Sequence, residues 1–278
     1  MDGIHCLIGR LSQHTSQTEF AMPQPTCYMC DQSSTSREHV PPRCLFPESK
    51  DVRGDFRQNL LTVPSCDEHN SGKSADDEFL MVSLAGIIGN NSIGYSHKFS
   101  KVNRAIHRSS FSLLNQAMKN QKWYVVEFGP NKFIDVIWGT PDYDRLLRCF
   151  DRIARGVHMA HFGRQFSGTS RTILGYIPSD SPNPAEFQRF IRDKVAIELE
   201  GKPRLGSNPD VFNFQFTAPD QFGLYLVHLQ FYGGLDVYVS MTTDGCQIPA
   251  NLAMLLIDGG IETTIKLGAE EYKFNIGS

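Results

Sequence analysis

The alternation of apolar and polar residues divides most of the chain into helices and strands. Residues 79–118 have a mostly helical pattern, interrupted by a loop rich in Gly, Asn and Ser at 89–96. Apolar side chains between 142 and 163 recur with a period of about 3.6 residues, which predicts an amphipathic helix that stops at Gly163. A further helix is expected over 184–200, after a loop rich in Pro, Ser and Asn.

Runs of β-branched and aromatic residues predict several strands. Two of them, 123–128 and 133–138, flank a turn at Gly129-Pro130-Asn131. Three more are expected at 211–218, 222–231 and 235–242. We therefore predict an α+β fold, in which a mainly antiparallel sheet in the second half of the chain carries its helices on one face.

The length of 278 residues fits two small domains slightly better than one large domain. We expect one unit at 24–118 and a larger α+β domain at 119–278. Residues 1–23 are polar and aperiodic, and Met22 offers a second start codon just before the first cysteine pair. This segment is therefore expected to be a flexible tail or an upstream-start extension.

Composition and charge narrow the functional classes. The chain has 40% hydrophobic and 21% charged residues and a net charge of −3, so any contact with nucleic acid has to be local. No apolar run approaches the roughly 18 residues of a membrane span, and the first residues do not have the pattern of a signal peptide. We expect a cytoplasmic protein with no membrane partner. The sequence contains neither a P-loop nor a dinucleotide-binding fingerprint.

Seven cysteines, an odd number without the spacing of a disulfide framework, indicate a reducing compartment and a metal. Cys27 and Cys30 are separated by two residues, and Cys66 and His69 have the same gap. Two such pairs predict a closed, structural zinc site with four protein ligands. Cys44 could replace one ligand, but it has no partner at this spacing.

The second pair is expected at the start of a helix. Ser65 could cap that helix, and Glu68 would complete a capping box. The acidic run Asp76-Asp77-Glu78 is expected in the first turn of the next helix, where the helix dipole favours negative charge, rather than in a second metal site.

Glu38 and His39 lie between the two pairs, just before Pro41 and Pro42. The prolines favour an extended backbone, in which adjacent side chains point to opposite faces. Other polar residues follow in a fixed order: Asn59 ahead of an apolar run, then His69, Asn70 and Lys73.

This order of residues resembles that of the HNH endonucleases, which are ββα-metal (His-Me finger) nucleases. The motif covers residues 27–73, roughly a quarter of the chain. The resemblance implies a small zinc-bound, treble-clef-like nuclease core, which together with the helices that follow it makes up residues 24–118 and precedes the larger α+β domain.

By this resemblance, His39 is the general base that activates water, and Glu38 and Asn70 hold a catalytic Mg²⁺ or Mn²⁺. The chemistry agrees, because an imidazole titrates near pH 6.5 and hard divalent ions prefer oxygen ligands. Asn59 corresponds to the central Asn that orients the base. Two positions depart from the common pattern: Glu38 stands where Asp is more usual, and Asn70 where His is more usual.

Two assignments stay open. Lys73 or Arg43 could contact a neighbouring phosphate. His69 could instead be the third motif residue, which would leave the zinc with three ligands, but the matching gap favours His69 as a zinc ligand.

The helix at 142–163 has a second, basic face. This face carries Arg148, Arg152 and Arg155, with His158 and His161 near its end. We expect a solvated face here, with a phosphate-contacting surface as the alternative.

The sequence thus predicts a metal-dependent endonuclease that hydrolyses double-stranded DNA, in a restriction, phage-defence or mobile-element context. A homo-oligomer formed through residues 119–278 is a further possibility. The alternatives are a non-catalytic zinc module that binds nucleic acid or a protein, and an RNA-cleaving nuclease.

Overall fold

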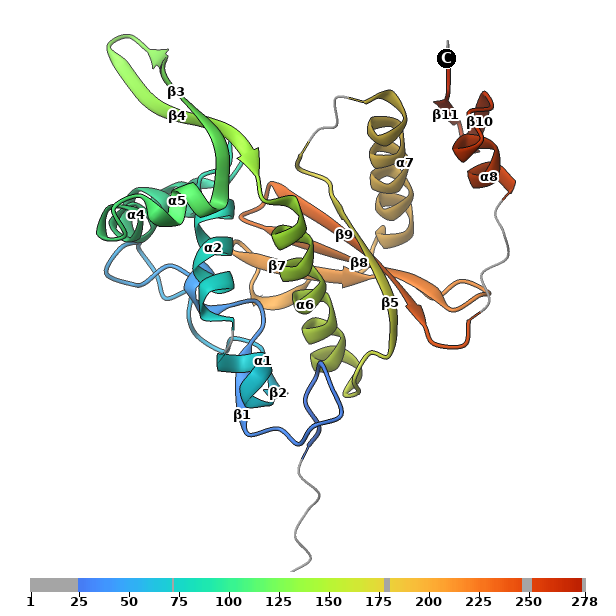
Figure 1. Ribbon diagram of the computed structural model, residues 1–278, viewed down its shortest axis with the longest axis horizontal. Coiled ribbons are helices and arrows are strands. Elements are labelled where there is room, and N and C mark those ends of the chain that lie inside the picture. The colour runs from blue at the N-terminus through green and yellow to red at the C-terminus, as the bar shows by residue number, and fades with distance from the viewer. Residues whose placement is uncertain (1–24, 72, 178–180, 247–251, 277–278) are drawn as a thin grey trace, which may run out of the picture.

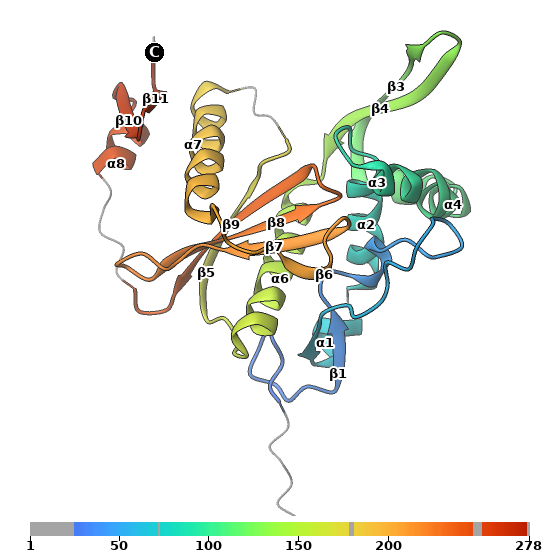
Figure 2. The ribbon, with the colours of Figure 1, turned by 180° about the vertical axis from the view of Figure 1, so that it is seen from behind.

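The computed structural model describes residues 25–71, 73–177, 181–246 and 252–276. A small N-terminal unit and a group of short helices lie beside a five-stranded antiparallel sheet (Figure 1). Two long helices cover the sheet, one on each face, as the opposite view also shows (Figure 2). The predicted α+β class is confirmed.

The N-terminal unit contains two short antiparallel strands followed by a short helix. Its elements are β1 (Ser36–His39), the 3-10 turn η1 (Arg43–Leu45), β2 (Thr62–Ser65) and α1 (Asp67–Ser71). In the register of the two strands, Ser36 lies opposite Ser65 and His39 lies opposite Thr62. The two residue pairs with matching gaps are therefore brought to the same end of one hairpin.

The expected capping box at α1 is not formed. Ser65 lies inside β2, and its hydroxyl donates a hydrogen bond to the Glu38 carboxylate at 3.2 Å. The buried carboxylate attracts this hydroxyl more strongly than a helix end would, because an unsatisfied buried charge is costly.

The region with the helical pattern forms a chain of short helices, and the first of them begins at Ser74. The elements are α2 (Ser74–Ala85), α3 (Ser92–His97), the π-helix η2 (Lys98–Val102), α4 (Asn103–Arg108) and α5 (Ser112–Ala117). Asp76 and Asp77 lie in the first turn of α2, as predicted. Asn91 caps α3, since its side chain accepts hydrogen bonds from the backbone N–H groups of Ile93 and Gly94.

The two strands predicted around Gly129-Pro130-Asn131 form a long hairpin. Strands β3 (Met118–Gly129) and β4 (Lys132–Pro141) are antiparallel and project from the body of the molecule (Figure 1). Trp123 and Trp138 are exposed on it.

The larger sheet has the strand order β5-β9-β8-β7-β6, and every neighbouring pair is antiparallel. Its strands are β5 (Gly168–Leu174), β6 (Leu205–Asn208), β7 (Phe212–Phe216), β8 (Leu224–Phe231) and β9 (Leu235–Thr243). The three strands predicted from apolar runs are β7, β8 and β9. Strands β5 and β6 were not predicted, because their sequences are short and mostly polar.

The two long helices are α6 (Tyr143–Phe162) and α7 (Pro182–Leu199). Helix α6 ends at Gly163 as predicted, with Gly163 in the left-handed conformation at φ 68°. The described ranges contain no helix that combines the length and the apolarity needed to cross a membrane.

The prediction that the helices cover only one face of the sheet is wrong. Strand β8 buries consecutive residues: Val227 faces the core that contains α6, and Leu226 packs with Tyr238 against α7. A strand that is apolar on both sides needs a layer on each face.

A small C-terminal element, which was not predicted, packs near α7. It consists of α8 (Leu252–Asp258), β10 (Thr263–Leu267) and β11 (Glu270–Phe274). Tyr272 of β11 donates a hydrogen bond from its hydroxyl to Asp193 of α7 at 2.9 Å, and Arg189 lies over the Tyr272 ring at 4.1 Å.

The largest hydrophobic core extends from the N-terminal unit to the five-stranded sheet. Tyr232, just after β8, donates a hydrogen bond to the backbone carbonyl of Leu45 at 2.6 Å. Gly156 of α6 lies against Val40, just after β1, so closely that an added Cβ would be 2.6 Å from the Val40 methyl groups. The N-terminal unit is thus packed directly on α6, while a division of the chain at 118/119 stays a prediction.

Candidate functional site

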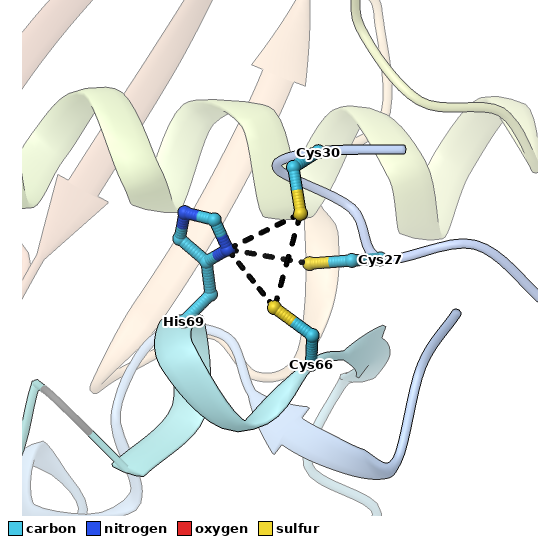
Figure 3. Close-up of side chains that lie close together, drawn as sticks. All are labelled: Cys27, Cys30, Cys66 and His69. Carbon is cyan, nitrogen blue, oxygen red and sulfur yellow. Dashed lines mark hydrogen bonds between the residues drawn. The ribbon is translucent and has the colours of Figure 1, made fainter. Parts of the chain in front are cut away.

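Four side chains from three parts of the N-terminal unit meet at one point. Cys27 and Cys30 lie in the loop before β1, Cys66 follows β2, and His69 lies in α1 (Figure 3). The Nδ1 atom of His69 is 3.7, 3.5 and 3.2 Å from the sulfur atoms of Cys27, Cys30 and Cys66, and the sulfur atoms of Cys30 and Cys66 are 3.8 Å apart.

These distances fit a tetrahedral metal centre. Bonds of about 2.3 Å to sulfur and about 2.0 Å to nitrogen would place neighbouring ligand atoms roughly 3.5–3.8 Å apart. The cluster could therefore bind a metal such as zinc, and the predicted meeting of these four residues is confirmed. Cys44 lies elsewhere, where its thiol donates to the backbone carbonyl of Asp77 at 3.2 Å.

Backbone hydrogen bonds hold the ligand loops in place. The N–H of Cys27 donates to the carbonyl of Gln32 at 2.8 Å, which closes the loop, and the N–H of Tyr28 donates to Pro64 in β2 at 2.9 Å. The N–H of Asn70 donates to the carbonyl of Cys66 at 3.0 Å and so forms the turn that brings His69 toward the cysteines. Because Nδ1 of His69 points at the three sulfur atoms, this arrangement agrees with a ligand role for His69 (Figure 3).

Glu38 and His39 differ in burial, as expected for neighbours on one strand. Glu38 is only 3% exposed and points inward, where its carboxylate accepts hydrogen bonds from the Tyr28 hydroxyl at 3.0 Å and from Ser65 at 3.2 Å. The Lys73 ammonium group forms an ion pair with the same carboxylate. Burial and the negative charge of Glu38 raise the pKa of Tyr28, so its hydroxyl remains a donor.

His39 is half-buried and opens onto a small pocket between β1, the start of α2 and the middle of α6. We call this the His39 pocket; its charged lining residues are Glu38, Lys73, Asp76, Asp77 and Arg152. Burial lowers the pKa of His39, and the positive charges of Arg43 and Lys73 lower it further. His39 is therefore a neutral imidazole at pH 7 and can accept a proton.

The two aspartates of the His39 pocket have different surroundings. Asp76 accepts hydrogen bonds from Arg145 and Arg152, each at 2.7 Å. Asp77 is 3.5 Å from the Lys73 ammonium group. Burial raises the pKa of Asp77 to about 6, and the nearby charge of Glu38 adds to this effect, while Lys73 opposes it.

The other predicted site residues lie outside this pocket. Asn70 donates from its side-chain nitrogen to the Ser36 hydroxyl at 2.7 Å. Asn59 is exposed, adopts a left-handed conformation at φ 52°, and accepts from Ser207 on its backbone carbonyl at 2.6 Å. Arg43 is exposed in η1. Of the predicted catalytic and phosphate-binding residues, Glu38, His39 and Lys73 meet in the pocket.

The sequence reading missed three lining residues. Asp76 and Asp77 lie in the first turn of a helix as predicted, and they also line the pocket beside His39. Arg152 lies on the helix face that we expect to be solvated, with phosphate contact as the alternative, but its guanidinium group binds Asp76 and lines the pocket. No local pattern reveals these contacts, because they depend on how α2 and α6 pack against β1.

Comparison with known proteins gives no relative from which a role could be transferred. No family model, no curated protein and no solved structure matches this chain.

Proposed function

We propose that this protein is an HNH-type endonuclease that hydrolyses phosphodiester bonds of DNA, with a treble-clef-like core stabilised by zinc. The observation that carries the proposal is the position of His39. It lies on a strand whose hairpin is fixed by the Cys27, Cys30, Cys66 and His69 cluster, and it opens onto a pocket lined by carboxylates.

His39 has the properties of a general base. Its pKa is lowered by burial and by Arg43 and Lys73, so the ring is neutral at pH 7 and accepts a proton from an attacking water. Of the two proposed phosphate contacts, Arg43 is the better candidate, because it is exposed near His39 while the Lys73 ammonium group is held by Glu38.

The divalent ion implied by the resemblance fits Glu38 and Asn70 poorly. The Glu38 carboxylate already interacts with Tyr28, Ser65 and the positive charge of Lys73. Asn70 does not line the His39 pocket, and its amide nitrogen donates to Ser36. Asp77 has a carboxylate in the pocket with a looser contact, so it is the better oxygen ligand for Mg²⁺ or Mn²⁺. We therefore assign no reaction step to an ion at Glu38.

The second candidate is a non-catalytic zinc module that binds nucleic acid or a protein. It is favoured by the same interactions of Glu38, because a buried carboxylate that is paired and hydrogen-bonded inside the protein stabilises the fold without any catalytic role. The DNA and RNA substrates, a restriction, defence or mobile-element context, and an oligomer formed through residues 119–278 all remain proposals.

The test is cleavage of supercoiled plasmid by the purified full-length chain, with and without Mg²⁺ or Mn²⁺. We expect cleavage by the wild type and a loss of roughly 10²–10⁴-fold in His39→Ala, the usual effect of removing a general base. His107→Ala, which removes an exposed histidine of α4, is the matched control. A fully active His39→Ala would refute the assignment, and a folded wild type that cleaves neither DNA nor RNA would favour the binding module.

A further inference from the structure

A second and larger groove lies beside the His39 pocket. It has a volume of about 580 Å³ and is bordered by the loop with the first cysteine pair, by α6 and by β5. Helix α6 and strand β5 pass close to each other in both views (Figure 1 and Figure 2). We call it the arginine groove; its principal lining residues are Met29, Arg148, Arg152, Ser170, Arg171 and Thr172.

Two arginines of the groove form no ion pair with any residue that the structure describes. Arg148 and Arg171 are exposed, and no carboxylate of the described residues lies within ion-pair distance of either. In contrast, Arg57, Arg104 and Arg145 each form an ion pair with a carboxylate.

The one carboxylate among the lining residues is already neutralised. Asp151 forms an ion pair with Arg155 at 3.0 Å and also accepts a hydrogen bond from the Ser170 hydroxyl. The groove therefore presents the unpaired guanidinium groups of Arg148 and Arg171 together with the hydroxyl group of Thr172, and guanidinium groups bind phosphate oxygens strongly and often in a bidentate way.

The groove is continuous with the candidate active site through Arg152. This side chain lines both cavities and is held in place by Asp76, to which it donates a hydrogen bond at 2.7 Å. An anionic strand bound along Arg148 and Arg171 would thus lie beside Arg152, a residue that also lines the His39 pocket.

We propose that the arginine groove binds the phosphodiester backbone of duplex DNA and directs it to the His39 pocket. The choice of DNA rests on the proposed function, whereas the preference for phosphate rests on the groove itself. The chain has a net charge of −3, so general attraction cannot hold DNA and binding has to come from local positive charge. Strand β5 is also an edge strand, so backbone N–H groups along its free edge can add phosphate contacts.

The experiment measures binding rather than cleavage. Full-length His39→Ala is titrated against a fluorescently labelled DNA duplex at several salt concentrations, and the same is done after adding Arg148→Ala and Arg171→Ala. We expect the two substitutions together to weaken binding by roughly tenfold or more and to reduce the slope of log K against log salt by about 2, near 1 for each lost phosphate contact.

The charge-matched control is His39→Ala with Arg108→Ala and Arg192→Ala, which removes two exposed arginines on α4 and α7. The control should keep both affinity and slope. A third variant, with Arg148→Lys and Arg171→Lys, keeps the charges and should restore the slope, which excludes unfolding as the cause.

Each result decides between defined alternatives. An unchanged affinity and slope in the Arg148→Ala/Arg171→Ala variant would refute DNA binding by the arginine groove, even if the wild type cuts DNA. Loss of binding in that variant, combined with a wild type that cuts nothing, would support DNA binding by the groove and refute the proposed nuclease activity. Tighter binding of a matched RNA duplex, lost on the same substitutions, would overturn the assignment to DNA.

Discussion

The carboxylate of Glu38 and the ammonium group of Lys73 form an ion pair that is almost completely shielded from water. Glu38 is 3% exposed and Lys73 is 8% exposed. The hydroxyl groups of Tyr28 and Ser65 donate two further hydrogen bonds to the carboxylate. Two buried charges are tolerated only when they are paired and hydrogen-bonded in this way. The pair therefore connects β1 to the start of α2 and fixes the wall of the His39 pocket.

Removing one member of this pair should destabilise the protein strongly. We expect Lys73→Met to lower the free energy of unfolding by about 3–5 kcal/mol, because Glu38 would be left as an unpaired buried charge. Urea denaturation measures the change. The double variant Glu38→Gln/Lys73→Met should recover most of the loss.

The control for this ion pair is Lys266→Met. Lys266 pairs with Glu271 at 3.0 Å, but both side chains are exposed, so the expected loss is about 1 kcal/mol or less. If Lys73→Met destabilises no more than Lys266→Met, the buried pair does not hold the pocket together.

The Cys and His cluster gives a prediction about metal content. We expect one tightly bound zinc ion per chain in the wild type and none in Cys66→Ser, with partial unfolding of the N-terminal unit because metal binding contributes folding energy. Elemental analysis and hydrogen exchange measure the two effects. Cys246→Ser, which changes a cysteine outside the cluster, should keep its zinc. Wild-type protein without zinc, or Cys66→Ser with normal zinc, would contradict the assignment.

The sequence predicted elements best where one strong periodicity runs through many residues. Helix α6 has an apolar stripe and ends at Gly163, and the β3–β4 hairpin has apolar strands around Gly129-Pro130-Asn131. Strand β5, with the sequence GTSRTIL, lacks such a pattern, and its position follows from pairing with β9. The second helical layer was missed because a strand that is apolar on both sides does not show which elements cover it.

The same contrast applies to the site. Two pairs with equal gaps were enough to predict the Cys27, Cys30, Cys66 and His69 cluster, since a tetrahedral metal needs only four ligands at compatible spacing. The surroundings of Glu38 were not predictable in this way. Its partners Tyr28, Ser65 and Lys73 come from separate segments, and each of these residues has an ordinary local explanation. Tertiary packing therefore changes the interpretation of Glu38 without changing that of the metal cluster.

Because Gly156 contacts Val40 closely, we expect a Gly→Ala substitution at this position to destabilise the protein rather than stabilise it. Gly→Ala in a helix normally stabilises by about 0.5–1 kcal/mol. Here an added Cβ would lie 2.6 Å from both Val40 methyl groups, so we expect Gly156→Ala to lower the free energy of unfolding by about 1–3 kcal/mol. His39 adjoins Val40, so any cleavage activity should fall as well.

A compensating substitution separates this steric clash from other effects. Val40→Ala makes room at the contact, so the double variant Gly156→Ala/Val40→Ala should be more stable than the sum of the two single changes implies. Additive losses in thermal or urea unfolding would show that α6 does not press on the end of β1.

The stability of the protein should decrease in mild acid because of His97. This side chain is fully buried; its Nε2–H donates to the carbonyl of Cys44 at 3.0 Å, and its Nδ1 has no hydrogen-bond partner. Burial lowers the pKa of His97 from 6.5 to about 4. The unfolded chain therefore binds a proton below pH 6.5 that the folded chain does not bind until about pH 4, so the free energy of unfolding falls as the pH decreases between these values. The full effect is on the order of 3 kcal/mol, at about 1.4 kcal/mol per pKa unit.

Urea unfolding at a series of pH values tests this effect. The decrease should be shallower in His97→Gln than in the wild type, while His107→Gln, at an exposed histidine, should follow the wild type. Parallel curves for His97→Gln and the wild type would show that His97 is not held neutral by burial.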